Sequence, residues 1–214
     1  MMPLPILELL FTAVSLLVLI GYHVVFYWRF RRKPLTTSLG LAHHLRGLWV
    51  ETVMTAQKDI LAVQTLRNWT MTATFLASTA IFLGLAVLNA ALSTGKLSSV
   101  VEVLHLVRPV SETFMAVKLI VLGVDFLLAF FNFTLALRYY NHTGFQINIP
   151  AGQNPNETQR LVAETLNRGG LHYTLGMRGY YLAIPLSLWM FGSLWFLLGS
   201  LLLVAVLARL DAGQ

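Results

Sequence analysis

Four long apolar runs constrain the fold of this chain more than any other feature. They cover residues 6–28, 69–92, 112–138 and 180–207. A helix rises about 1.5 Å per residue, so each run is long enough to cross a hydrocarbon core about 30 Å thick. Charged residues make up only 11% of the chain, against about 25% in ordinary soluble domains. We therefore predict an all-α, polytopic membrane protein, a bundle of four transmembrane helices in a single integral membrane domain over residues 1–214.

An amphipathic helix is expected before the second span. Residues 39–66 place leucines and a tryptophan on one stripe, whereas Arg46, Lys58 and Asp59 fall on the opposite side. Such a helix lies on the membrane surface or packs under the bundle. Whether it is continuous with the second span stays open at this point.

Two shorter helices are expected in the connectors. Residues 100–107 could form an interfacial helix between the second and third spans. After a loop rich in proline and glycine, Asn156 can cap a short cytoplasmic helix over residues 157–167. The pair Gly169-Gly170 is expected to end that helix, since glycine is the usual residue just past a helix C-terminus.

The distribution of basic residues predicts the orientation in the membrane. Seven Lys and Arg lie between Arg29 and Arg67, and four lie between Arg138 and Arg178. The connector between the second and third spans holds two. Because cytoplasmic connectors carry the excess of Lys and Arg, the two long connectors are expected in the cytoplasm. Both termini are then expected outside, in what we predict to be a bacterial inner membrane.

The third run carries a line of polar residues. Lys118, Asp125 and Asn132 are spaced by seven, nearly two helical turns, so they drift only about 20° per step. An ionised group in mid-membrane costs about 3 to more than 10 kcal/mol, so the line should face other helices or water. It is either a relay for protons, ions or polar solutes, or a set of structural pins that hold the bundle in register.

A second candidate site is a set of residues at the cytoplasmic ends of the spans. Guanidinium groups hold phosphate or carboxylate bidentately, so the set could bind an anion or an acidic lipid head group. The alternative is that the arginines only anchor the helices at the interface. The members are Arg67, Arg138, Arg178, Gln64, Asn68, Asn141 and Tyr181.

Several classes of chemistry find no support in the sequence. The absence of cysteine excludes disulfides, thiolate metal sites and a cysteine nucleophile. The six histidines are scattered, and no zinc-protease, phosphate-loop or nucleophile-elbow motif occurs. We expect no metal site, no cofactor and no enzymatic activity. The net charge of +6 lies mostly beside apolar runs, so orientation in the lipid bilayer explains it before nucleic acid does.

Three blocks of residues resemble a known membrane family over roughly residues 46–211. They are AVQTLRN at 62–68 with Met71, Ala73 and Thr74; Val117-Lys118, 129–131 and 138–141; and 176–181, 184–186 and 188–192. This family of bacteria and plants is catalogued as domain of unknown function 599. The resemblance implies a four-helix membrane protein and brings no activity. Where relatives often have Gly-Pro, this chain has Gly192-Ser193.

Two classes of function remain. The polar line favours translocation of an ion, proton or small polar solute, and since four helices enclose little space a homo-oligomer is expected. The alternative is a non-catalytic accessory subunit that docks other membrane proteins in a larger complex. Its docking seams would be small residues at helical spacing, namely Ala73, Ala77, Ala80 and Gly84, and Gly192, Ser193, Gly199 and Ser200.

Overall fold

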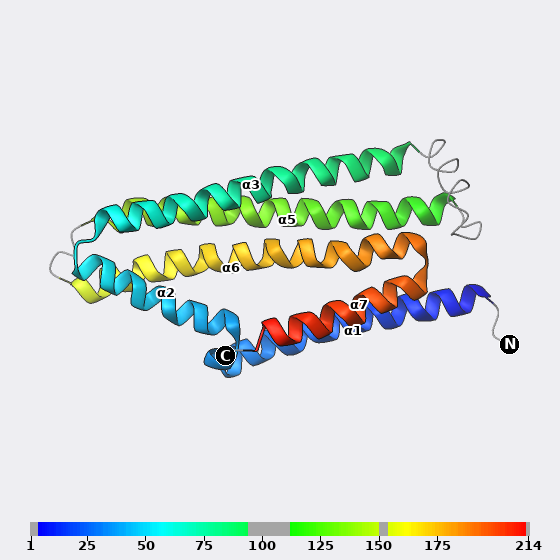
Figure 1. The fold of residues 1–214 in the computed structure, drawn as a ribbon, viewed down its shortest axis with the longest axis horizontal. Coiled ribbons are helices and arrows are strands. Elements are labelled where there is room, and N and C mark those ends of the chain that lie inside the picture. The colour runs from blue at the N-terminus through cyan, green and yellow to red at the C-terminus, as the bar shows by residue number, and fades with distance from the viewer. Residues whose placement is uncertain (1–3, 94–111, 150–153, 213–214) are drawn as a thin grey trace. The chain divides into compact units, whose positions relative to one another are not determined.

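The computed structural model describes residues 4–93, 112–149 and 154–212, which form helices and no strand (Figure 1). In chain order the elements are α1 (Leu4–Arg32), η1 (Pro34–Thr36), α2 (Ser38–Thr55), α3 (Asp59–Leu92), α5 (Glu112–Gln146), α6 (Pro155–Leu188), η2 (Trp189–Phe191) and α7 (Ser193–Leu210). Among the described residues α1, α3, α5 and α7 are long and apolar enough to cross a membrane. The all-α class with four candidate spans is thereby confirmed. The helix expected over residues 100–107 lies outside the described residues.

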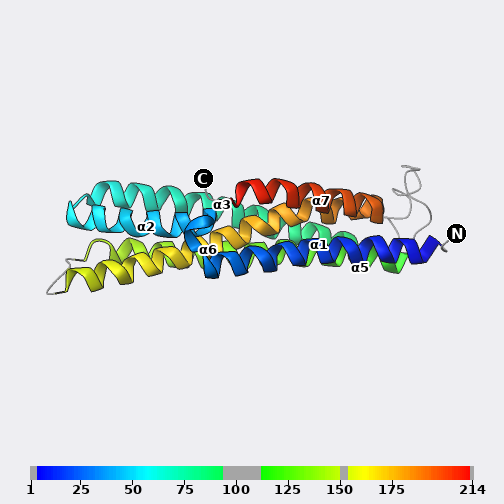
Figure 2. The same ribbon diagram turned by 90° about the horizontal axis from the view of Figure 1, so that it is seen from below.

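The amphipathic segment is not one helix. The prediction over residues 39–66 is wrong because α2 ends at Thr55 and α3 begins at Asp59 (Figure 2). Gln57 between them has a φ of 49°, a left-handed conformation that interrupts a right-handed helix. Asp59 lies in the first turn of α3, where a carboxylate is favoured by the helix dipole. The amphipathic helix is therefore separate from the second span.

The prediction of a short helix over residues 157–167 is also wrong, because these residues belong to α6, which continues to Leu188. Gly169 and Gly170 lie inside α6 instead of ending it. A Cβ atom on Gly169 would meet the ring of Tyr140 at 2.7 Å, and one on Gly170 would collide with the guanidinium of Arg46. Because these glycines have no side chain, Tyr140 and Arg46 can approach the α6 backbone closely. The glycine pair therefore serves packing, although in the sequence it looks like the end of a helix.

The fourth span exists, but the bounds predicted for it, residues 180–207, are wrong, because the span is α7 alone. The chain leaves α6 at Leu188, turns through η2 and Gly192, and starts α7 at Ser193 (Figure 1). Gly192 has φ 137° and ψ 162°, a conformation that is essentially restricted to glycine. Within the hairpin, a Cβ on Gly199 of α7 would lie 3.2 Å from the Cα of Pro185 in α6. The two helices thus pack closely because position 199 has no side chain.

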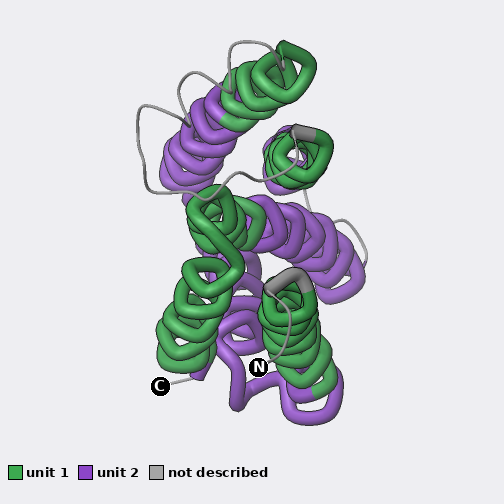
Figure 3. The backbone as a smooth tube through the Cα atoms, turned by 90° about the vertical axis from the view of Figure 1, so that its right-hand side faces the viewer, with its two compact units in different colours: residues 1–28, 80–128, 178–211 green, residues 29–79, 129–177, 212–214 purple. Residues whose placement is uncertain are grey.

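The chain folds into two compact units, which share the long helices α1, α3, α5 and α6 (Figure 3). Unit 1 comprises residues 1–28, 80–128 and 178–211, and unit 2 comprises residues 29–79, 129–177 and 212–214. The core of unit 1 contains Leu19, Leu122, Phe126, Ala183, Leu186, Trp189, Phe196, Leu203 and Leu207. The core of unit 2 contains Val50, Val53, Ala62, Leu66, Ala73, Ala136, Tyr140, Ile147, Val162 and Leu166.

Contacts within unit 1 fix the direction of its helices. Near the start of α5, Lys118 donates to the carbonyl of Trp189 in the α6–α7 turn. At the other end of α7, Asp211 accepts a hydrogen bond from Tyr22, far along α1 from the N-terminus. The C-terminal end of α7 therefore lies well away from the start of α1. The chain reverses direction at η2, between α6 and α7, a turn that the predicted single helix over residues 180–207 did not include. The sides of the membrane on which the two termini lie stay a prediction.

The small-residue seams pack inside the chain. Ala73 and Ala80 are completely buried, and Ser200 is also completely buried. In unit 1, a Cβ on Gly84 of α3 would lie 3.3 Å from the Cβ of Phe126 in α5. The close approach that small residues permit is thus used between helices of this one chain.

Candidate functional site

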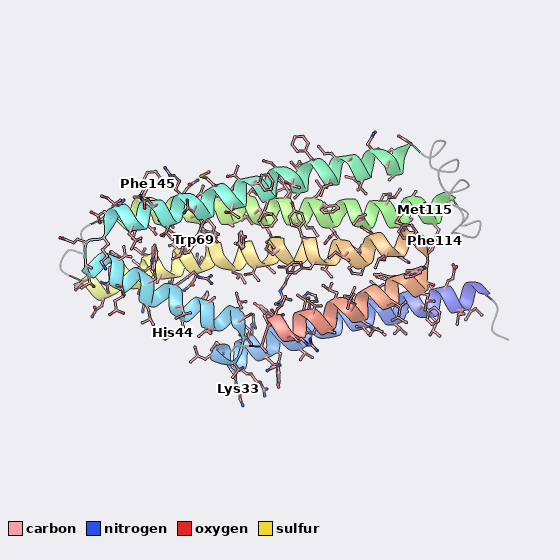
Figure 4. The ribbon with its side chains drawn as sticks, viewed as in Figure 1. Lys33, His44, Trp69, Phe114, Met115 and Phe145 are labelled. Carbon is pink, nitrogen blue, oxygen red and sulfur yellow. The ribbon has the colours of Figure 1, made fainter. Side chains whose placement is uncertain are left out.

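The polar line of α5 begins with Lys118, which is only 2% exposed. Its Nζ donates a hydrogen bond of 2.9 Å to the carbonyl oxygen of Trp189. The same Nζ lies 4.8 Å from the ring centroid of Phe114 and 5.5 Å from that of Trp189. Figure 4 labels Phe114, which lies near the start of α5. A carbonyl and two aromatic faces together stabilise a buried ammonium group. Lys118 is therefore a pin that joins α5 to the α6–α7 turn.

Asp125 stands two turns further along α5 and is not satisfied in this way. Leu122 and Ala129, which share its helix face, are both buried. Its Oδ2 atom is buried and has no hydrogen-bond partner among the described residues. An unpartnered buried carboxyl oxygen costs free energy that packing does not recover. Buried polar atoms in folded proteins are nearly always hydrogen-bonded, so an unpartnered carboxyl oxygen calls for an explanation, and a functional role is one.

The third member of the line, Asn132, is paired with a histidine that was not predicted. Nδ1 of His172 on α6 lies 3.1 Å from Oδ1 of Asn132. Because an amide oxygen only accepts, this hydrogen bond requires the proton on Nδ1. The imidazole stacks on Tyr139, with ring centroids 5.6 Å apart and planes 7° from parallel. This unit 2 cluster continues the polar line with a group that can carry a proton.

Arg178 was predicted to lie at the cytoplasmic end of a span, either to bind an anion or acidic lipid head group or to anchor the helix. In the structure it is 7% exposed, and its Nη2 donates to Asp211 Oδ2 over 2.6 Å. The hydroxyl of Tyr22 donates to the same oxygen, also over 2.6 Å. Phe26 covers the guanidinium, with its ring centroid 4.1 Å from Cζ. Since Asp211 neutralises it, Arg178 is not available as the cation that the anion-site hypothesis needs.

The other members of the proposed anion site divide by exposure. Tyr181 is half-buried and packs against the core of unit 1. The remaining five are exposed on unit 2, as side chains that anchor a helix at the membrane interface are. These are Arg67, Arg138, Gln64, Asn68 and Asn141. Among residues 4–93, 112–149 and 154–212, no three His, Asp or Glu side chains gather as a metal site would require.

Sequence reasoning missed Tyr22, Asp211 and His172. Asp211 follows an apolar run directly, and its pairing with Arg178 depends on the hairpin at Gly192. His172 lies in a part of α6 that falls between the helix expected over residues 157–167 and the span expected over residues 180–207. The usable signal was the isolation of Asp211, a single acidic residue after an apolar helix of 18 residues.

Comparison with known proteins places the chain in one family. The model of a family described as "Protein of unknown function, DUF599" matches residues 10–214. No curated protein and no solved structure matches the chain at a significant level. The family match covers nearly the whole chain and includes every candidate residue discussed above. This membrane protein therefore belongs to the DUF599 family.

Proposed function

We propose that this protein translocates a proton, an ion or a small polar solute across the membrane past the carboxyl group of Asp125. The observation that carries the proposal is the buried Oδ2 of Asp125, which has no hydrogen-bond partner in the described part of the chain. A purely structural aspartate would be expected to bond to another helix. An ionisable side chain in the middle of a transmembrane helix is by default a candidate for a proton or ion pathway.

The rest of the line supports this proposal. Along α5, Asp125 stands seven residues after Lys118 and seven before Asn132. Lys118 holds the helix in place through Trp189, and Asn132 adds His172, whose imidazole can accept and release a proton. Because four helices enclose little space, we further propose that a homo-oligomer supplies the remaining wall of the pathway.

The accessory-subunit alternative receives less support. It rests on small-residue seams that would dock other membrane proteins. Those residues pack against helices of the same chain, as Gly84 does against Phe126 and Gly199 against Pro185. Close packing within the chain thus accounts for these two seam residues without a partner protein, which favours translocation over this alternative.

The test is proton flux into liposomes that contain the purified protein and a pH-sensitive dye. We expect Asp125→Asn to remove the flux and to leave folding and insertion intact, since Asn keeps the shape of Asp and loses only the charge and the proton. The matched control is Asp59→Asn, which removes an exposed aspartate from the start of α3. Undiminished flux in Asp125→Asn would refute the proposed pathway.

A further prediction concerns sidedness. The basic residues Arg29, Arg31, Arg32 and Lys33 end α1, and the positive-inside rule places that end in the cytoplasm. Thr37, just beyond them, pairs with Ala212, so we propose that the C-terminus is cytoplasmic and the N-terminus outside.

Because the chain has no native cysteine, single cysteines report sidedness directly. In sealed cells Ser93→Cys, at the far end of α3, is expected to react with an impermeant thiol reagent. Ala212→Cys is expected to react only after permeabilisation. The opposite labelling pattern would refute this orientation.

A further inference from the structure

Unit 2 contains a cavity of about 310 Å³ that the polar line does not use. Four helices contribute to it, namely α2, α3, α5 and α6. Its lining residues are Arg46, Trp69, Thr72, Tyr140 and Tyr173. Small-molecule sites usually have volumes of about 300–1,000 Å³, so this cavity suits a small ligand.

Arg46 is the charged member of the lining. The sequence predicts that Arg46 lies on the polar side of an amphipathic helix. In the structure its side chain lines the cavity within unit 2. Its Nε donates to Oδ1 of Asn167 over 2.8 Å, and Nδ2 of Asn167 donates to the carbonyl of His43 over 3.2 Å. Gly170 leaves room for the guanidinium, because a Cβ there would collide with it. The guanidinium is thus held in one position from two sides.

The charge on Arg46 has no counterion among the described residues. No carboxylate of that part of the chain forms an ion pair with it, and its Nη2 is buried without a hydrogen-bond partner. Burial lowers the pKa of the Arg46 guanidinium, but arginine remains protonated at neutral pH. Arg46 is half-buried, and leaving its buried Nη2 donor unused costs free energy unless an anion binds to it.

The walls of the cavity are mainly aromatic. The ring centroid of Trp69 lies 5.8 Å from that of Tyr140 and 5.7 Å from that of Trp49. Tyr173 is held by Phe133, with ring centroids 5.8 Å apart. The hydroxyl of Thr72 donates to the carbonyl of Asn68, so its methyl group adds apolar surface. These walls suit a planar apolar group, and the single cation suits a single negative charge.

We propose that this cavity binds a small aromatic monocarboxylate, with the carboxylate on Arg46 and the ring against Trp69 and Tyr140. An inorganic phosphate would satisfy the guanidinium but would leave the aromatic walls without a partner. A neutral aromatic molecule would fill the walls and leave the charge of Arg46 uncompensated. The site stands independently of the proposed role of Asp125, since no lining residue belongs to the α5 polar line.

The probe is benzoate, titrated by calorimetry into the purified full-length protein in a non-ionic detergent. Benzyl alcohol has the same ring and no charge, so it is the matched neutral ligand. We expect benzoate to bind about 10- to 100-fold more tightly than benzyl alcohol, the range for hydrogen bonds to a charged group. Equal affinities for the two ligands, or stronger binding of inorganic phosphate, would overturn the proposal.

Variants locate the site. Arg46→Met is expected to reduce the affinity for benzoate by the same factor, whereas Arg160→Met, which removes an exposed arginine from α6, should leave it unchanged. If Arg46→Met fails to fold, Asn167→Ala still tests the proposal, because it keeps the charge and releases Nε. We expect Asn167→Ala to weaken benzoate binding several-fold. Unchanged binding in every folded variant of Arg46 and Asn167 would refute the site.

A lipid phosphate is the competing source of an anion. The titration is therefore repeated in nanodiscs of phosphatidylcholine, with and without phosphatidylglycerol. We expect the same affinity for benzoate in both. Loss of benzoate binding in the presence of phosphatidylglycerol would mean that an acidic lipid takes the site, and would overturn the assignment to a soluble carboxylate.

Discussion

Replacement of Asp211 by alanine is expected to destabilise the protein by about 3–5 kcal/mol, the cost of removing one partner from a buried ion pair. Arg178 and Asp211 have side-chain exposures of 8% and 14%, and their charged atoms are 2.6 Å apart. Without the carboxylate, the guanidinium of Arg178 would stay buried with no counterion. Tyr22 would lose its acceptor at the same time.

The measurement is the free energy of unfolding in mixed micelles, obtained by titration with a denaturing detergent. The matched control is Glu164→Ala, which breaks the exposed pair with Arg160 and should cost at most about 1 kcal/mol. A double variant, Arg178→Met with Asp211→Leu, removes both charges and should recover much of the lost stability. A cost below 1 kcal/mol for Asp211→Ala would show that the pair is not an important contact.

The four candidate spans could be predicted from the sequence because both of their determinants are local. The length of an apolar run sets whether a helix reaches across the bilayer, and the backbone of that helix satisfies its own hydrogen bonds. The polar line on α5 could also be predicted from the sequence. Lys118, Asp125 and Asn132 share one helix, so their spacing alone predicts a common face.

The hairpin between α6 and α7 could not be predicted in the same way. The residues around Gly192 are as apolar as those of a continuous span, and glycine inside such a run is ordinary. What distinguishes Gly192 is its φ of 137°, which becomes visible only in the folded chain. Gly169 and Gly170 caused the opposite error, because the sequence predicted a helix end at this pair, whereas both residues lie within α6.

The partners of the charged groups were not predictable for a related reason. Arg178 and Asp211 lie 33 residues apart in the chain, and Arg46 and Asn167 lie 121 apart. Helical periodicity says which side of a helix a residue occupies, but not which other helix covers that side. The sequence therefore predicted only that Arg46 lies on the polar side of the amphipathic helix, and not that it lines a cavity in unit 2.

The second large effect on the free energy of unfolding is expected for substitution of a glycine on α2. Gly40→Ala is expected to destabilise the protein by about 3 kcal/mol, at the upper end of the usual cost of overpacking. A Cβ at position 40 would collide with the backbone carbonyl group of Pro34. That carbonyl oxygen accepts hydrogen bonds from both the amide and the hydroxyl of Thr37, so it cannot move aside without breaking them. The methyl group therefore has to open the turn that starts α2.

Gly47 on the same helix is the matched control, because a Cβ there would meet nothing within 4 Å. Gly47→Ala is expected to stabilise the protein by about 0.5–1 kcal/mol, the helix-propensity difference between the two residues. The same substitution, seven residues apart on α2, should thus shift the free energy of unfolding in opposite directions. Thermal and detergent-induced unfolding of the two variants measure the difference. Equal effects at both positions would mean that the contact between Pro34 and Gly40 does not hold the start of α2, and that the helix carrying Arg46 is positioned by other contacts.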